Sequence, residues 1–211
     1  MRKSTFLIFL IVFVIGIFTL AIDDISAQVS SVQNKVTIVR DAKAVKYNPM
    51  IFGQFIEHFD NQIYGGIYDP GSPLSDEDGI VKRTTYYVLW MYTNLLEENV
   101  LPVEGEFAKL SRGDQQTGVF DVVLTADKEG KRRVYAVVNK SPDEDIDLTI
   151  DLNIPGKSTS EQVKATVLSG NSPDDYNDRG RENVIPQQRI LKVHDGKVSI
   201  PAHSLTFVEV M

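Results

Sequence analysis

The sequence predicts a mainly β protein whose C-terminal half forms an antiparallel β-sandwich. Short runs rich in β-branched residues follow one another at even spacing between residues 120 and 210. Turn residues separate these runs, and no helical pattern lies between them. Evenly spaced strands without intervening helices are typical of a sandwich.

The N-terminal elements begin with residues 36–41, VTIVRD, which alternate and are predicted to be a strand. Asn48-Pro49 marks a turn, and the apolar run 51–59 fits a buried strand. The acidic, glycine-containing span 60–79 is predicted to be a long loop, longer than a simple connection requires.

Residues 84–99, TTYYVLWMYTNLLEEN, form the one predicted helix. Thr84 or Thr85 could cap its N-terminus. An apolar stripe is expected to face the core, and its members are Tyr86, Leu89, Trp90, Thr93 and Leu96. The apolar surface is wide for so small a domain, so we expect a large body to pack against it.

The sandwich strands follow after Pro102. The run 120–140 is predicted to be a hairpin with its turn at 127–130, and 190–201 a second hairpin with its turn at Asp195-Gly196. Single strands are predicted at three further runs, which are 146–152, 162–168 and 204–210.

The first 27 residues are typical of a secretory signal peptide. Arg2 and Lys3 precede an apolar run from Phe6 to Ile22, and Ser26-Ala27 is an acceptable cleavage site. An uncleaved anchor is the alternative, because the run approaches the length of a membrane span. Cleavage predicts a secreted or periplasmic protein with no stable membrane insertion.

Composition limits the classes of partner. The chain has 211 residues, a formal charge of −7 and no cysteine, so disulfides are excluded. An acidic chain without a basic cluster argues against nucleic acid, and a neutral partner such as a sugar is compatible with it.

No motif for metal, cofactor or nucleophilic serine chemistry is present. The three histidines, His58, His194 and His203, lack ligand spacing. The acidic stretches 76–79 and 173–178 are interpreted as solvated loops rather than calcium sites. Glu57, at the end of an apolar run, is the one carboxylate whose position suggests a polar cleft.

Residues 48–79, NPMIFGQFIEHFDNQIYGGIYDPGSPLSDEDG, resemble the start of α-L-arabinofuranosidases of glycoside hydrolase family 51. Residues 83–210 resemble the end of the same family, through TTYYVLWMY, LSGNSPDDYND and PAHSLTFVEV. The resemblance implies a catalytic (β/α)8 barrel together with a jelly-roll β-sandwich built from both chain ends.

The implied organisation has four parts. A signal peptide occupies 1–27, N-terminal sandwich strands 28–47, a barrel remnant 48–99 and the C-terminal β-sandwich 100–211. The remnant comprises the first barrel strand, a loop and the last barrel helix. The resemblance also implies a homo-oligomer and a partner that is an arabinose-containing polysaccharide or oligosaccharide.

Most of the barrel is missing from this chain, because DEDGI at 76–80 runs directly into VKRTTYY at 81–87. By the resemblance, both catalytic carboxylates of the retaining mechanism lie in the missing part, so no catalytic residue is assigned. Glu57 alone carries over, as the residue that hydrogen-bonds hydroxyls of the bound arabinose.

We therefore expect an α-L-arabinofuranosidase-family protein that is inactive as written. The alternative is a non-catalytic module that binds carbohydrate or protein through its sandwich. A gap in the recorded gene, with a full-length enzyme as its product, is a further explanation of the junction.

Overall fold

The computed structural model of the protein describes residues 33–48, 51, 75–76, 79–80, 82–154, 161–178 and 181–211. Its elements are β1 (Lys35–Ile38), β2 (Val45–Lys46), β3 (Ser75–Asp76), β4 (Gly79–Ile80), α3 (Thr84–Leu95), β5 (Asn99–Leu101), β6 (Val103–Glu106), β7 (Lys109–Arg112) and β8 (Gln115–Gly118). The remaining strands are β9 (Phe120–Ala126), β10 (Arg133–Asn139), β11 (Ile146–Thr149), β12 (Gln162–Leu168), β13 (Gln187–His194), β14 (Lys197–Ile200) and β15 (Ser204–Val210).

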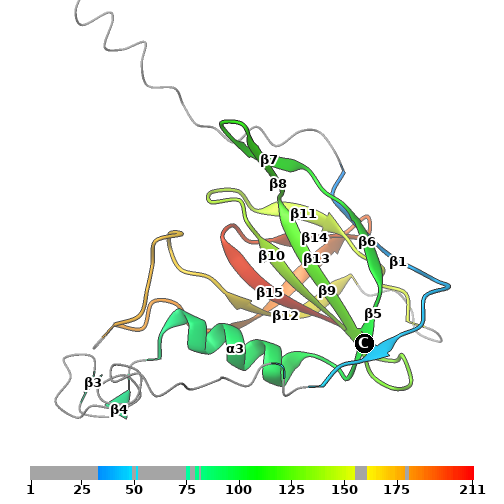
Figure 1. Ribbon diagram of the computed structural model, residues 1–211, viewed down its shortest axis with the longest axis horizontal. Coiled ribbons are helices and arrows are strands. Elements are labelled where there is room, and N and C mark those ends of the chain that lie inside the picture. The colour runs from blue at the N-terminus through cyan, green and yellow to red at the C-terminus, as the bar shows by residue number, and fades with distance from the viewer. Residues whose placement is uncertain are drawn as a thin grey trace, which may run out of the picture.

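Eleven of these strands form one curled sheet in the order β2-β5-β9-β10-β15-β12-β13-β14-β11-β1-β6 (Figure 1). Strand β13 connects the two layers of the resulting sandwich. Its residues 187–192 pair with β12 in one layer, and Val193 and His194 pair with β14 in the other. The predicted mainly β sandwich is thus confirmed.

The strand predicted at 36–41 is β1, which ends earlier, at Ile38, and β1 and β2 both join the sandwich sheet. Strand β1 pairs with β6 and, in parallel, with β11, while the two-residue β2 pairs with β5. The N-terminal segment therefore contributes to both ends of the sheet order.

The two predicted hairpins are present because their turns have the backbone that such turns need. Asp195 and Gly196 both have positive φ, 51° and 72°, as a two-residue primed turn requires. In the β9–β10 turn, Gly130 has φ 66° and the Lys131 N–H donates to the Asp127 carboxylate at 2.7 Å.

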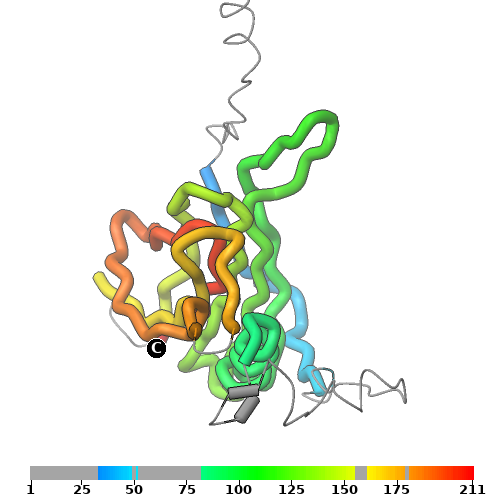
Figure 2. The backbone as a smooth tube through the Cα atoms, turned by 90° about the vertical axis from the view of Figure 1, so that its left-hand side faces the viewer, coloured from blue at the N-terminus to red at the C-terminus, as the bar shows by residue number. Residues whose placement is uncertain are grey.

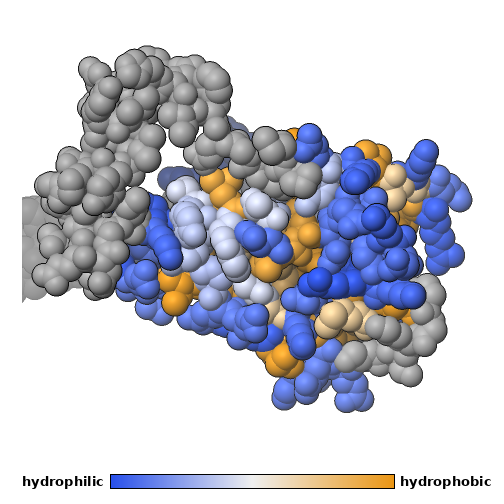
Figure 3. Space-filling view, turned by 90° about the horizontal axis from the view of Figure 1, so that it is seen from below, coloured by the Kyte–Doolittle hydropathy of each residue, from blue (hydrophilic) through white to orange (hydrophobic). Residues whose placement is uncertain are grey.

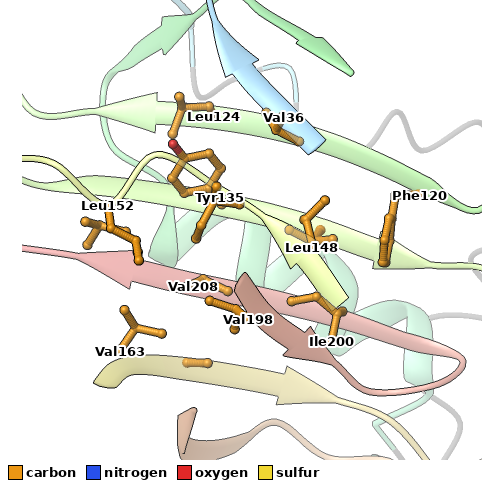
Figure 4. Packing of buried hydrophobic residues seen from close by; sticks show 14 of the residues in the cluster. Val36, Phe120, Leu124, Tyr135, Leu148, Leu152, Val163, Val198, Ile200 and Val208 are labelled. Carbon is orange, nitrogen blue, oxygen red and sulfur yellow. The ribbon is translucent and has the colours of Figure 1, made fainter. Parts of the chain in front are cut away.

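The main core lies between the two layers, and its side chains come from both (Figure 4). The largest fully buried members include Phe120, Leu124, Tyr135, Leu148 and Ile200. The Tyr135 hydroxyl donates to the Asp151 carbonyl at 3.1 Å, so the one polar tip among these five is satisfied.

A second apolar layer lies on the outer face of the sheet, where α3 packs across β10 and β15 (Figure 2). Met91 is fully buried there, and the Tyr92 ring meets Phe207 edge-on with centroids 5.3 Å apart. Strands β10 and β15 are consequently buried on both faces.

The helix differs from its prediction in three respects. It ends at Leu95, four residues early, because Leu96 is extended and Asn99 already pairs with Ala126. Arg83 is the N-cap, without a side-chain capping bond, in place of Thr84 or Thr85. The predicted core stripe is right only in part, since Leu96 packs against the apolar layer whereas Tyr86 and Trp90 are 45% and 40% exposed.

The face of α3 that contacts the sandwich is the opposite one. It consists of Tyr87, Val88, Met91, Tyr92 and Leu95. The helix is apolar on both sides, so the periodicity of its apolar residues did not determine which side packs inward.

Several elements were not predicted individually. Strands β5 and β6 and the projecting hairpin β7–β8 lie in the span 99–118 (Figure 1). Of the predicted buried strand 51–59 only Ile51 is described, and it is 67% exposed and outside any strand. Most of the loop 60–79 and the signal segment 1–27 lie outside the described residues. Within the described part, no helix has the length and apolar character of a membrane span.

Candidate functional site

The junction between α3 and the sandwich is the best-defined candidate site among the described residues. It contains a hollow of about 330 Å³ between the N-terminal half of α3, the loop 169–175 and the ends of β10, β12 and β15. Its floor is apolar, with Val88, Val138 and Leu168 among the lining residues, and its rim carries Ser172, Asp175 and His203 among others.

Asn177 holds the N-terminal end of α3 against this junction. Its side-chain amide donates to the Lys82 carbonyl at 2.9 Å and to the Val184 carbonyl at 2.7 Å, and its Oδ1 accepts the Val184 N–H at 2.7 Å. Asn177 is fully buried. A buried amide with its bonds satisfied fixes one geometry, so Asn177 joins the loop 171–184 to the start of the helix.

Arginines strengthen the same end of the helix. Arg83 donates to the Asn177 carbonyl at 2.8 Å and lies 3.7 Å from the Asp178 carboxylate. Arg181 lies 3.6 Å from Asp175 and stacks over the Tyr176 ring at 5.0 Å. The acidic stretch 173–178 is a loop, as expected, with Pro173, Asp174 and Tyr176 exposed to solvent, but Asn177 within it is buried and anchors it.

The residues just beyond the C-terminal end of α3 are held by Arg132. Its guanidinium lies 2.7 Å from Glu97 and 3.1 Å from Glu209, which joins this segment to β15. The Glu97 N–H donates to the Thr125 hydroxyl at 3.0 Å. Burial raises the pKa of the Glu97 carboxyl above its ordinary value of 4.5, although the attraction of Arg132 opposes that shift.

His203 closes one side of the hollow. It has φ 37°, an uncommon backbone for a residue other than glycine. Its Nδ1 lies 2.7 Å from the Pro142 carbonyl and its Nε2 lies 3.2 Å from the Gly170 carbonyl. Each ring nitrogen faces a carbonyl oxygen, and a neutral imidazole with one N–H donates to one of the two. The ring therefore lies between two backbone segments, which indicates a structural role.

Two further hollows lie elsewhere on the sandwich. One, of about 470 Å³, lies over β12, β13 and β15 and includes Lys164, Gln188 and Glu209. The other, of about 630 Å³, lies beside the β7–β8 hairpin and includes Arg112, Gln116 and Lys140.

Carboxylates in these three hollows are isolated from one another. Asp175 lines the first and Glu209 the second, while the third has none. Asp175 already accepts the Asn171 N–H at 2.7 Å and faces Arg181, and Glu209 is held by Arg132. A retaining glycosidase needs two carboxyl groups about 5–5.5 Å apart. None of the three hollows has such a pair.

The residues singled out from the sequence lie in different parts of the chain, and some are not described by the structure. Glu57, the expected sugar-binding residue, and His58 lie outside the described residues. His194 is exposed at the end of β13. In the described ranges, no group of three histidine, aspartate or glutamate side chains is arranged to hold a metal ion.

Sequence reasoning missed Asn177 as a buried residue. The available signal was LSGNSPDDYND, which was noticed as a family-like segment but interpreted as solvated. Its burial depends on Lys82, 95 residues away along the chain, and that proximity follows only from the fold.

The fold and the junction together define a class of protein, a β-sandwich domain that carries a packed helix on one sheet and has no complete hydrolytic site in its described hollows. Residues 72–204 match the family model described as the α-L-arabinofuranosidase C-terminal domain. The chain belongs to this family.

Curated relatives agree with this assignment. The chain is 53% identical over 47 residues to α-L-arabinofuranosidase C of Emericella nidulans, covering 22% of this chain and 9% of the relative. It is 26% identical over 155 residues to an exo-α-(1→6)-L-arabinofuranosidase of Bifidobacterium longum, covering 63% of this chain and 30% of the relative. The chain thus spans less than a third of the length of these enzymes.

Solved structures share the fold. The family 51 α-L-arabinofuranosidase of Thermotoga petrophila matches with a TM-score of 0.53 at 15% identity, over 64% of this chain and 30% of that one. A family 51 α-L-arabinofuranosidase of Bifidobacterium longum matches with a TM-score of 0.52 at 22% identity, over 64% and 27%.

Proposed function

We propose that this chain is the β-sandwich part of an α-L-arabinofuranosidase-family protein that acts with arabinose-containing glycans. The observation that carries the proposal is the match of residues 72–204 to the C-terminal domain of that family. This span includes α3, the Asn177 junction and every strand from β3 to β14. The relatives' names supply the glycan class.

We further propose that the chain does not hydrolyse arabinofuranosides by itself. The carboxylates of the described hollows are single and already engaged, by Arg181 in one case and by Arg132 in the other. Glu57 would position a sugar through charge-assisted hydrogen bonds to its hydroxyls, without breaking a bond. Loss of both members of a catalytic pair removes the acid/base step and the nucleophilic step together.

The test is an assay of aryl α-L-arabinofuranoside hydrolysis with the purified full chain. We expect no turnover above that of a heat-denatured sample, with folding verified by circular dichroism. Turnover that disappears in Glu57→Gln and persists in the matched exposed variant Glu182→Gln would contradict the proposal.

Affinity electrophoresis through arabinan separates glycan binding from hydrolysis. Retardation that Glu57→Gln reduces, without turnover, would support sugar positioning by Glu57. The exposed aromatics of the described residues are Tyr86, Trp90 and Tyr176, none of them on a strand. Among the described residues, the sheet faces therefore carry no flat row of exposed aromatic side chains that could bind a carbohydrate.

The junction between residues 78 and 85 is tested by amplifying and sequencing this part of the gene. If amplified DNA is contiguous across these codons, the short chain is the gene product. If codons for a barrel intervene, the product is a longer member of the family, and the proposal of inactivity fails.

Secretion or periplasmic location is proposed on the basis of the first 27 residues alone. N-terminal sequencing of the protein recovered from the culture medium or periplasm should begin at Gln28. A cell-associated product that begins at Met1 would favour the anchor.

A further inference from the structure

The projecting hairpin β7–β8 lies at the end of the molecule opposite to α3 (Figure 1, Figure 2). The α3 end shows pale and orange side chains over the helix, with blue ones on either side (Figure 3). The hairpin, in contrast, is polar and exposed along most of its length. A two-stranded hairpin with few buried residues adds little to stability, so its composition points to a contact outside the chain.

A tight turn fixes the tip of the hairpin. Gly113 and Asp114 form the two-residue turn, and Gly113 has φ 58° whereas Asp114 does not have a positive φ. This combination corresponds to a type II′ turn, which has glycine at its first central position. Arg112 and Gln115 pair directly on either side of the turn, so the backbone that carries them is held in one register.

The face of the hairpin that is turned toward the sandwich changes in character along its length. Leu110 and Thr117 pair at its base, where Leu110 packs against the main core and the Thr117 hydroxyl accepts a hydrogen bond from Lys140 Nζ at 3.2 Å. Arg112 and Gln115 lie on the same face, because side chains two residues apart on a strand point the same way. They are about 7 Å nearer the tip. The face is therefore apolar at its base and cationic at its tip.

A hollow of about 630 Å³ lies between this face, Lys140 and Pro142. Its volume is within the range of small-ligand pockets, which is roughly 300–1,000 Å³. The Lys140 ammonium connects the hairpin to β9, because it donates to Thr117 and also, at 3.0 Å, to the Asp121 carboxylate. Contacts within the chain therefore hold the hairpin beside the sandwich and form the hollow.

The polar groups of the hollow contain more donors than acceptors. Arg112 and Lys140 can only donate, and no lining residue is a carboxylate. Lys140 is paired with Asp121, but Arg112 has no ion pair and no side-chain hydrogen bond with any described residue. A guanidinium presents its N–H groups as a planar fork that matches a carboxylate. Arg112 is thus the group that an anionic ligand would meet.

Three carboxylates adjoin the lining residues without lining the hollow themselves. Asp121 is bound to Lys140, Asp114 lies in the turn, and Asp143 follows Pro142. These groups and the overall charge of −7 oppose the approach of an anion. Salt limits that repulsion to about 8 Å at physiological ionic strength, so a short acidic ligand held by the guanidinium is favoured over a long polyanion.

We propose that this hollow is a binding site for a uronic acid unit of a glycan, whose carboxylate binds the Arg112 guanidinium. The sugar ring lies over Leu110 and Pro142, which supply an apolar surface for its C–H face, and its hydroxyls bond to the Gln115 amide. The inference rests on the proposed function for the choice of a glycan among carboxylate ligands, and it adds an acidic unit to that glycan. It makes no use of Glu57.

The first test is an NMR titration of the 15N-labelled full chain with trigalacturonic acid. We expect shifts confined to the amides of β7, β8, Lys140 and Ser141. Arg112→Ala should raise the dissociation constant about tenfold or more, because a charge-assisted pair is lost. The matched control is Arg189→Ala, which removes an exposed arginine on β13 that bonds to Gln187 and should leave binding unchanged.

A second variant separates the shape of the cation from its charge. Arg112→Lys keeps the charge and loses the planar fork, so its affinity should lie between those of the wild type and Arg112→Ala. Because the Arg112 side chain has no partner among the described residues, both variants should keep the wild-type spectrum outside the hairpin. Affinity in Arg112→Lys no better than in Arg112→Ala would show that the fork geometry is essential, which also supports a bidentate carboxylate.

Matched ligands separate the carboxylate from the sugar ring. Fully methyl-esterified trigalacturonate, which keeps the rings and loses the charge, should bind about tenfold more weakly or worse. Inorganic phosphate and a triglutamate peptide, which keep the charge and lack the rings, should each bind more weakly than trigalacturonic acid. Equal or tighter binding of either one would assign the hollow to anions or acidic peptides in general and would overturn the proposal.

Two further results would overturn it. One is the absence of hairpin shifts at millimolar trigalacturonic acid, and the other is a dissociation constant that Arg112→Ala does not change. Neutral arabinan tests the proposed function separately. Retardation in arabinan without hairpin shifts would leave the proposed function in place and remove this inference, whereas hairpin shifts without retardation would do the reverse.

Discussion

The core between the two layers of the sandwich and the layer beneath α3 share strands β10 and β15 but are closed in different ways. In the core, apolar side chains from both layers surround Tyr135 and Leu148, and both residues are fully buried. Beneath α3, one face of a helix is buried and the other remains open. Polar contacts near the two ends of the helix, at Asn177 and at Arg132, complete its attachment.

This difference indicates which part of the molecule can loosen while the other stays intact. The sandwich core is closed mainly by the packing of apolar side chains, so its stability depends on how completely its volume is filled. The helix layer depends on a few directional contacts, so single polar substitutions can loosen it while the sandwich stays intact.

The largest effect is expected from a cavity in the core. Leu148→Ala should lower the free energy of unfolding by about 2–5 kcal/mol, because it removes a fully buried side chain from between the layers. Urea denaturation followed by circular dichroism measures this change. The exposed Ile190→Ala should stay within about 0.5 kcal/mol of the wild type, and equal losses in both variants would refute the distinction between core and surface.

The next effect is expected at the α3 layer. Asn177→Ala leaves the Val184 N–H and the Lys82 carbonyl without their partner, at a cost of about 1–3 kcal/mol. Hydrogen exchange should speed up for amides of α3 and of residues 171–184 more than for those of β11. Asn171→Ala, an exposed change in the same loop, is the control. Uniform acceleration in all strands would mean that the helix and the sandwich unfold as one unit.

A smaller effect is expected from removing the Tyr135 hydroxyl, a polar group within the core. Tyr135→Phe removes the bond to the Asp151 carbonyl and should cost about 1 kcal/mol at pH 7. Denaturant titrations of both proteins at neutral pH measure it. A variant as stable as the wild type would show that this bond contributes nothing net.

The same substitution has a pH signature. Burial raises the pKa of the Tyr135 phenol far above its ordinary value of 10.0. The unfolded chain therefore loses this proton first, and stability falls as pH rises above 10, by at most about 1.4 kcal/mol per pH unit. Tyr135→Phe should reduce the slope of stability against pH in this range. If the slope is unchanged, the loss of stability comes from other tyrosines.

The smallest effect is expected at Glu97. Because the pKa of this carboxyl is raised in the folded state, the folded protein holds the proton more strongly than the unfolded chain. Its contribution to stability is complete below pH 4.5 and is lost as pH rises through the folded pKa. Glu97→Gln should flatten the stability profile in that range, with a change of under about 1 kcal/mol at pH 7 because the Arg132 partner is half exposed. A steeper profile in the variant would contradict this assignment.

Much of the sandwich could be predicted from the sequence because its strands alternate and its turns carry their own signals. The strand 204–210 and the Asp195-Gly196 hairpin are confirmed as expected. The β7–β8 hairpin was missed because its residues are mostly exposed on both faces, so KLSRGDQQTG has no apolar alternation.

The candidate site was less accessible to sequence reasoning. The buried face of α3 could not be chosen, because Tyr86 and Trp90 on one side and Tyr87 and Met91 on the other give similar periodic patterns. The burial of Asn177 requires contacts that are distant along the chain, with Lys82 in particular. Glu57 was singled out by its position at the end of an apolar run, and its sugar-binding role, which comes from the resemblance, stays a prediction.

Strand β6 is the edge strand at the opposite end of the sheet from β2, and its side chains affect how copies of the protein meet in concentrated solution. Strand β6 pairs with β1 on one side, and its sequence VEGE exposes Glu104 and Glu106. Two such edges approaching one another would bring like charges together and resist joining into a continuous ribbon. Fibrous aggregation through this edge should therefore be suppressed.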